Sequence, residues 1–406
     1  MTGVLDLFLN DRRAGVLTLL PDGRILFSFD ETYAEDPARP VLSQSYFAPD
    51  GELLTSTKTY SGKAPPFFSN LLPEGHLREY LAERGGIKPT NEFHLLYLLG
   101  EDLPGAVIAK EGERFSLPLK KEEEERLEIK EAQQPLRFSL AGVQLKFSAL
   151  MARDGGLTIP ASGMGGNWIV KLPSPAYDNI PENEYAMMHM AAEIGIPVPE
   201  TKLVPLSSIA GLPDFGKLRG TRALAVKRFD RTENGKRIHM EDFAQVYSIF
   251  PEKKYEGVSF TNIAGMIWTL TGEDGLRDFI RRLAYTILTG NGDMHLKNWS
   301  FIYRDSRTPA LSPAYDMVST VPYISNDRLA LTFLNTKEMK LCNLGLFEKL
   351  AEKAGLPKKL VLDVAKETAE RTREVWKKNK AHYALSSDIK KVIDGHMKEV
   401  MLSDKG

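Results

Sequence analysis

Polar residues crowd into a short segment, Asn291 to Ser300, that directly follows the pattern of an amphipathic helix. Apolar residues recur before it at helical spacing, and Gly290 can end that helix; they are Leu276, Phe279, Ile280, Leu283 and Ile287. An aspartate followed five residues later by an asparagine, here Asp293 and Asn298, is the spacing of a phosphotransferase catalytic loop. In such a loop the carboxylate receives a hydroxyl proton and the amide oxygen binds Mg²⁺. We therefore favour phosphoryl transfer over a turn whose side chains only cap the backbone.

A second acidic residue, Asp316, follows this segment in the sequence Ala314-Tyr315-Asp316. In kinases a second metal ligand comes after the catalytic loop, beyond a short strand. Mg²⁺ prefers one or two carboxylates together with phosphate oxygens and water, so Asp316 and Asn298 are a sufficient contribution from the protein. By itself, a Tyr-Asp pair is more often a cap or a turn.

A lysine lies inside an otherwise apolar strand, Trp168 to Leu172. Burying Lys171 is costly unless its ammonium group meets an anion, as the third-strand lysine of protein kinases does. Glu184, on the helix that follows, is the candidate ion-pair partner. A strand with one solvated face, which would point Lys171 to water, is the alternative that this run leaves open.

Small residues precede the strand that begins at Phe147. The segment is Ser139-Leu140-Ala141-Gly142-Val143-Gln144-Leu145-Lys146. Small side chains let a backbone approach phosphate groups closely, and the lysine adds a positive charge. The segment matches neither common glycine-rich phosphate motif, so an ordinary β-turn is the other interpretation.

The chain divides into a β-rich half and a helical half. Alternating apolar residues from Leu5 to Phe29 predict antiparallel strands, and residues 67–99 predict helices with Asn91 as an N-cap. Further strands are expected at 147–151, 168–172 and 224–229, and a helix at 182–195. The expected division is an N-terminal subdomain at 1–108, a charged linker at 109–135, the rest of an N-terminal lobe at 136–230, and a helical C-terminal lobe at 231–406. Two such lobes predict a cleft between them.

The composition of the chain indicates which kinds of partner it can bind and in which cell compartment we expect it. The 53 Lys and Arg residues nearly balance 54 Asp and Glu residues, so the chain has no overall basic field for nucleic acid. Its single cysteine, Cys342, excludes an internal disulfide and a Cys-x-x-Cys metal site. The first residues lack a signal-peptide pattern, and no apolar run reaches about 18 residues, so we expect a cytoplasmic protein that does not enter a membrane.

Several segments in this order together resemble the HipA family of serine/threonine kinase toxins, which is distantly related to phosphatidylinositol-4-kinase-like enzymes. They are residues 70–75, 138–146, 169–173, 228–231, 291–300 and 315–316. The resemblance extends over nearly the whole chain. It implies an α+β, two-lobed kinase-like fold with a β-rich N-terminal lobe, an extra N-terminal subdomain and an all-helical C-terminal lobe. It also implies ATP and Mg²⁺ as cofactors.

The resemblance assigns roles to individual residues. Asp293 would be the catalytic base, and Asn298 and Asp316 would bind Mg²⁺. The nucleotide would contact a phosphate loop of Ala141, Gly142, Val143, Gln144, Leu145 and Lys146, then Lys171, the adenine hinge at Lys227, Arg228 and Phe229, and finally His295, Leu296, Lys297 and Tyr315. Lys227 replaces the glutamate of a common Glu-Arg-Phe hinge pattern, so only backbone contacts to adenine carry over.

The resemblance further implies that the chain regulates itself. Ser139 would be autophosphorylated, which in the family ejects the phosphate loop and inactivates the enzyme. A phosphate there adds about −1.5 to −2 charges beside a loop that must hold another anion.

Partners also follow from the resemblance. They are a small helix-turn-helix antitoxin like HipB, operator DNA contacted through that antitoxin, and an aminoacyl-tRNA synthetase, in particular glutamyl-tRNA synthetase, as the protein substrate. A kinase acting on a small molecule or lipid would share every nucleotide-site residue. An inactive HipA-like binding partner is a further alternative, which the joint presence of Lys171, Asp293, Asn298 and Asp316 disfavours. The seven histidines show no HxH or HxxxH pairing, which disfavours a zinc hydrolase.

Overall fold

The computed structural model describes residues 3–56, 58–112, 146–151, 157–158, 166–212, 216–400 and 402. An N-terminal domain opens with an antiparallel five-stranded sheet in the order β4-β3-β2-β1-β5. The strands are β1 (Gly3–Leu9), β2 (Arg12–Leu19), β3 (Arg24–Phe29), β4 (Tyr60–Ser61) and β5 (Val107–Glu111), and the helices are α1 (Glu31–Glu35), α2 (Pro66–Ser69), α3 (Gly75–Arg84) and α4 (Glu92–Leu99). Alternate residues of β1 are buried, and the Asn91 side chain accepts a hydrogen bond from the backbone N–H of His94, so both of these predictions are confirmed.

The next part of the chain forms a six-stranded sheet with one helix packed on it. Its order is β10-β7-β6-β8-β11-β9. The elements are β6 (Lys146–Met151), β7 (Leu157–Thr158), β8 (Trp168–Lys171), α6 (Ile180–Glu193), β9 (Thr201–Pro205), β10 (Ile209–Ala210) and β11 (Arg222–Lys227). Lys171, at the end of β8, lies opposite Lys146 of β6 and Leu224 of β11. This register places Lys171 in the interior of the sheet.

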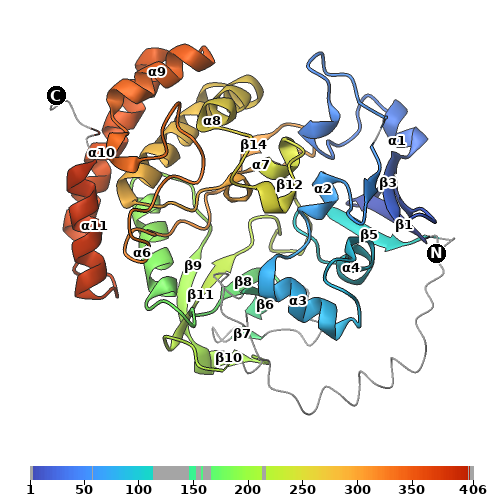
Figure 1. Ribbon diagram of the computed structural model, residues 1–406, viewed down its shortest axis with the longest axis horizontal. Coiled ribbons are helices and arrows are strands. Elements are labelled where there is room, and N and C mark those ends of the chain that lie inside the picture. The colour runs from blue at the N-terminus through green and yellow to red at the C-terminus, as the bar shows by residue number, and fades with distance from the viewer. Residues whose placement is uncertain are drawn as a thin grey trace.

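The C-terminal lobe is built on α8, whose two helical parts meet at a kink at Gly272, and α9, α10 and α11 follow it. Its helices are α7 (Phe243–Val246), α8 (Phe260–Thr289), α9 (Leu344–Ala354), α10 (Lys358–Asn379) and α11 (Ser387–Glu399). Figure 1 shows α9, α10 and α11 along the side of the molecule opposite the N-terminal sheet. The apolar residues predicted to form the buried face of α8 are all fully buried, and Gly290 ends the helix with φ 66°. None of the described helices is long and apolar enough to cross a membrane.

This lobe, which we expected to be all-helical, also contains a three-stranded sheet. Its strands are β12 (His239–Asp242), β13 (Ser300–Tyr303) and β14 (Ala310–Leu311). All four residues of β13 are buried, so its sequence shows no alternation of apolar and polar residues. β13 starts directly after the polar segment, and the sheet therefore fixes that segment from its C-terminal side.

Buried ion pairs join the N-terminal domain to the rest of the chain. The guanidinium group of Arg228 donates to both carboxylate oxygens of Asp230, at 3.0 and 2.8 Å, and to Asp102 of the N-terminal domain at 3.0 Å. The backbone N–H of Gly105 also donates to Asp230, at 2.9 Å. Removing one partner of such a cluster leaves a buried charge uncompensated, so these contacts hold the two domains in one arrangement.

A buried carboxylate, Glu241 on β12, lies at the same interface, and its hydrogen-bond donors among the described residues are uncharged. It accepts hydrogen bonds from the hydroxyl of Ser43 at 2.6 Å, the backbone N–H of Gln44 at 3.0 Å and the hydroxyl of Tyr303 at 2.5 Å. Burial outweighs these donors and raises the pKa of Glu241 from 4.5 to about 7. The folded chain therefore favours the protonated form of this side chain.

We expect this pKa to make the stability of the chain depend on pH. The pKa of Glu241 is higher in the folded state than in the unfolded state. The stability that the folded chain gains from protonating Glu241 is therefore fully present below about pH 4.5 and is lost as the pH rises towards about 7. Glu241→Gln keeps the shape and cannot ionise. The melting temperature of Glu241→Gln minus that of wild type should thus be a few degrees larger at pH 8 than at pH 5. Thermal unfolding of both proteins at both pH values measures this difference. A melting-temperature difference that stays constant with pH would contradict the raised pKa.

Candidate active site

Three charged side chains from separate elements meet at the end of β8. The ammonium group of Lys171 donates to Glu184 on α6 at 2.5 Å and also contacts the carboxylate of Asp316. Burial alone would lower the pKa of Lys171, but the two carboxylates outweigh it and hold that pKa above its usual value. Lys171 is therefore a buried, charged group, and the alternative that it points to solvent is wrong.

Asp316 has an unusual backbone as well as a charged partner. Its φ angle is 53°, in the left-handed region that few residues other than glycine adopt and that aspartate and asparagine tolerate best. Burial would raise the pKa of its carboxyl group, but the positive charges of Lys171 and Lys146 hold it below the usual value. The carboxylate is thus ionised and contacts the ammonium group of Lys171.

The polar segment after α8 is ordered by its own side chains. The side-chain oxygen of Asn291 accepts from the backbone N–H of Asp293 at 2.9 Å, so the turn interpretation is correct for Asn291. The amide nitrogen of Asn298 donates to the backbone carbonyl of Asp293 at 2.8 Å, and the N–H of His295 donates to the same oxygen at 2.8 Å. Because its nitrogen is used in this way, Asn298 can offer its amide oxygen to a cation.

The carboxylate of Asp293 does not cap the backbone. It accepts a hydrogen bond from the hydroxyl of Tyr255 at 2.6 Å. Burial raises the pKa of Asp293 above its ordinary value, and the Tyr255 hydrogen bond opposes that rise. A raised pKa of this kind suits a carboxylate that takes up a proton during a reaction. Sequence reasoning did not find Tyr255, because no local pattern links it to Asp293.

His295 leaves a polar atom without a partner. Its side chain is buried, and its Nδ1 atom makes no hydrogen bond among the described residues. Burial lowers the pKa of His295 to about 3, so the ring is neutral. A buried nitrogen without a partner costs stability unless something pairs with it, and a phosphate-bound water or a ligand hydroxyl would do so. Together with the carboxylate of Asp316 and the amide oxygen of Asn298, this nitrogen forms a set of acceptor atoms that suits Mg²⁺-ATP.

Two residues of the predicted nucleotide site face elsewhere. The ammonium group of Lys297 donates to the backbone carbonyl of Asn70 at 2.9 Å and pairs with Glu74 at 3.0 Å, both in the N-terminal domain. Glu74 also accepts from Lys254 at 2.8 Å, and these two cations lower its pKa to about 2 against the effect of burial. The side chain of Leu296 is fully buried in the core of the C-terminal lobe. The polar segment is thus bound directly to the N-terminal domain through Lys297.

The predicted adenine hinge lies where β11 ends. The backbone N–H of Arg228 donates to the carbonyl of Asn167 at 2.8 Å, and Lys227 forms ion pairs with Glu200 and Glu233 at 3.9 and 3.6 Å. The rings of Phe229 and Tyr315 lie 5.6 Å apart and tilted. Tyr315, which directly precedes Asp316, therefore links the end of β11 to the cluster of Lys171, Glu184 and Asp316.

The predicted phosphate loop falls largely outside the described residues. Ser139 and residues 141–145 are not among them. Lys146, the last residue of that loop, is described; it is exposed and lies opposite Lys171 in the sheet. Its charge contributes to the lowered pKa of Asp316, which places its positive charge near the cluster.

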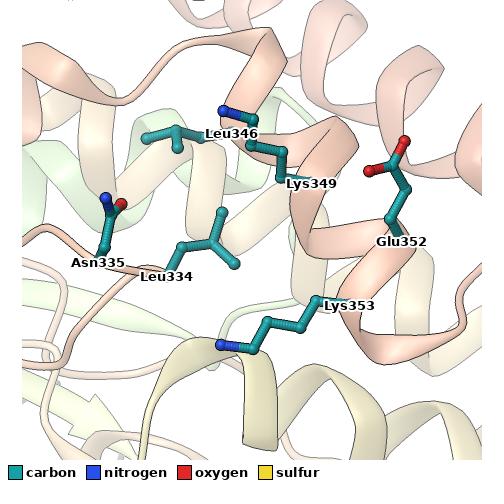
Figure 2. A pocket seen from close by; sticks show the side chains of 6 residues that line it. All are labelled: Leu334, Asn335, Leu346, Lys349, Glu352 and Lys353. Carbon is teal, nitrogen blue, oxygen red and sulfur yellow. The ribbon is translucent and has the colours of Figure 1, made fainter.

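A groove on the C-terminal lobe lies apart from these residues. Figure 2 shows it between α9 and the turn at Leu334, with the ammonium groups of Lys349 and Lys353 on either side of two leucines. Its volume is about 530 Å³, and it is lined by Leu334, Asn335, Leu346, Lys349, Glu352 and Lys353. None of the predicted site residues lines it, so the groove has no part in the chemistry proposed below.

The buried lysine–glutamate pair, the further aspartate and the aspartate–asparagine loop define a two-lobed, kinase-like fold with an additional N-terminal domain. Residues 5–110 match the HipA N-terminal domain, and residues 138–376 match the HipA-like C-terminal domain. The chain belongs to the HipA family.

Individual relatives agree with this assignment. The chain is 50% identical to the protein Y4dM of Sinorhizobium fredii over 403 residues, which cover 98% of this chain and 97% of that protein. It is 28% identical to the serine/threonine-protein kinase toxin HipA of Shewanella oneidensis over 65% of this chain and 64% of that one. Its fold matches the solved complex of the Shewanella oneidensis toxin–antitoxin proteins HipA and HipB with operator DNA, with a TM-score of 0.73 and 24% identity over 98% of this chain and 96% of that chain.

Proposed function

We propose that this chain is an ATP-dependent serine/threonine protein kinase of a HipA-type toxin–antitoxin module. The observation that carries the proposal is the buried ammonium group of Lys171, which contacts both Glu184 and Asp316. In kinases the corresponding lysine pairs the nucleotide phosphates and a helix glutamate, and the corresponding aspartate binds Mg²⁺. Packing alone does not explain this arrangement, because a buried Lys171–Glu184 pair with a partly exposed carboxylate beside it costs more than apolar residues of the same size.

The residues of the site divide the reaction between them. Asp293 accepts the proton of the acceptor hydroxyl, and Lys171 neutralises phosphate charge from the N-terminal lobe. Asn298 and Asp316 would hold Mg²⁺, which when bound balances the charge that develops on the transferred phosphoryl group. Glu184 keeps the ammonium group of Lys171 in place, and the hydrogen bonds at the backbone carbonyl of Asp293 keep the base in position.

We infer that the chain phosphorylates itself at Ser139. Intact-mass measurement and site mapping after incubation with Mg²⁺-ATP should find one phosphate on the wild-type chain and none on Ser139→Ala. Activity towards protein should then decline with time in the wild type and persist in Ser139→Ala, because a phosphate there repels the nucleotide. An unmodified Ser139 in a chain that phosphorylates other proteins would contradict this inference.

The proposal includes partners that the family suggests. A HipB-like antitoxin would bind the chain and carry it to operator DNA, as in the Shewanella oneidensis complex. The protein substrate would be an aminoacyl-tRNA synthetase, such as glutamyl-tRNA synthetase, in the cytoplasm. Adding that synthetase to the chain and Mg²⁺-ATP tests this choice, and labelling of a small molecule or lipid in its place would favour a different kinase class.

A further inference from the structure

Tyr255 is the one described side chain seen to donate a hydrogen bond to the Asp293 carboxylate, yet the nucleotide chemistry above gives it no role. Its hydroxyl donates to Oδ1 of Asp293 at 2.6 Å. Its side chain is 42% exposed, and its ring packs edge-on against His295 with 5.0 Å between ring centroids. A surface tyrosine therefore reaches in to the atom that the proposed function assigns to proton transfer.

The position of this hydroxyl is the one that an acceptor hydroxyl needs. A general base has to lie about 2.6–3.2 Å from the oxygen whose proton it takes. Hydrogen bonds from a hydroxyl to a carboxylate are short and stronger than those between neutral groups. Tyr255 thus competes with any hydroxyl that approaches this oxygen of Asp293, whether it belongs to a protein or to water.

Displacing Tyr255 requires only its side chain to rotate. The backbone of the segment is held in place, because the carbonyl of Lys254 accepts from the backbone N–H of Leu296 at 3.2 Å and the Lys254 ammonium group is paired with Glu74. The ring is partly exposed, so it can turn into solvent without opening the core. An incoming protein surface makes further contacts that can offset the loss of the Tyr255 hydrogen bond, whereas a single water molecule brings only its own hydrogen bonds.

We propose that Tyr255 gates the catalytic base against water, an inference that rests on the proposed kinase function. Without an acceptor, its hydroxyl occupies Asp293; a protein hydroxyl displaces it and takes the same hydrogen bond. With the gate removed, water can react: its oxygen bonds to the γ-phosphorus, the bond from that phosphorus to the β–γ bridging oxygen breaks, ADP leaves with the electron pair, and the proton passes to Asp293. The products are ADP and inorganic phosphate.

The test measures release of inorganic phosphate from Mg²⁺-ATP with no protein acceptor present. Tyr255→Phe keeps the ring against His295 and removes only the hydroxyl. We expect it to raise phosphate release about tenfold, the size of effect associated with one hydrogen bond to a charged group. Adding Asp293→Asn to Tyr255→Phe should abolish the increase. Tyr247→Phe is the matched control, since the Tyr247 hydroxyl makes no hydrogen bond among the described residues and its loss should leave the rate unchanged.

Each outcome decides between the proposals. Unchanged or lower phosphate release by Tyr255→Phe, in a chain that labels Ser139 or a protein substrate, would overturn the gate and leave the kinase function standing. An increase that persists in the double variant would also overturn it, because the water would then react without the base. If wild type and every variant neither transfer nor release phosphate, the proposed function fails and the gate with it. Thermal unfolding of Tyr255→Phe confirms that the variant is folded.

Discussion

Asp293→Asn should lower phosphoryl transfer by about 10²- to 10⁴-fold, the usual contribution of a positioned general base. The amide has nearly the shape of the carboxylate and can still accept the hydrogen bond of Tyr255 through its oxygen. The contacts at the backbone carbonyl of residue 293 do not involve the side chain and remain. The fold and the affinity for nucleotide should therefore change little. The measurement is the initial rate of phosphate incorporation, with melting temperature and calorimetric nucleotide affinity measured on the same samples.

Asp305→Asn is a suitable control for this variant. Asp305 lies at the surface between β13 and β14, where it accepts hydrogen bonds from Arg307 and Thr308. The same chemical change there should leave the transfer rate at its wild-type value. A wild-type rate for Asp293→Asn would remove Asp293 as the base.

Asp316→Asn should weaken the binding of ATP in the presence of Mg²⁺ by about tenfold or more, because a carboxylate ligand of the metal is lost. Asparagine tolerates the left-handed backbone at this position, where φ is 53°, so the loop should keep its shape. Lys171 keeps its ion pair with Glu184. Calorimetric titrations with Mg²⁺ and with a chelator measure the effect. In wild type the metal should strengthen binding, and in the variant the two titrations should agree.

A response of the variant to Mg²⁺ equal to that of wild type would contradict the role of Asp316 as a ligand. Glu182→Gln is a matched control, since Glu182 is a buried acid on the same helix as Glu184 and pairs with Arg222 rather than with Lys171. Its nucleotide affinity should keep the full dependence on the metal.

Sequence patterns predicted the parts of the fold that local chemistry determines. Gly290 ends α8 because glycine adopts a positive φ more easily than any other residue, and Asn91 caps α4 through its own side chain. The pairing of Lys171 with Glu184 was also predicted, since an apolar strand followed by a helix places the two residues close together. These predictions all rest on residues near one another in the sequence.

Contacts between distant segments could not be predicted in this way. Glu74 pairs with Lys254 and Lys297, which both lie in the C-terminal half of the chain, and no periodicity links the three. The same holds for Tyr255 beside Asp293 and for Glu241 beside Ser43. β13 was not predicted for another reason. A strand buried on both faces lacks the alternation of apolar and polar residues that marks a strand with one buried face.

The pairing of Glu74 with two lysines limits which N-terminal domains of other family members could replace the one in this chain. Lys297 belongs to the polar segment and Lys254 directly precedes Tyr255, yet Glu74, which pairs with both, comes from the HipA N-terminal domain. A graft that brought in a foreign N-terminal domain without an acid at this place would leave two ammonium groups short of their counter-charge beside the base. A working exchange of the N-terminal domain therefore requires that the incoming domain supply an acid at the place of Glu74.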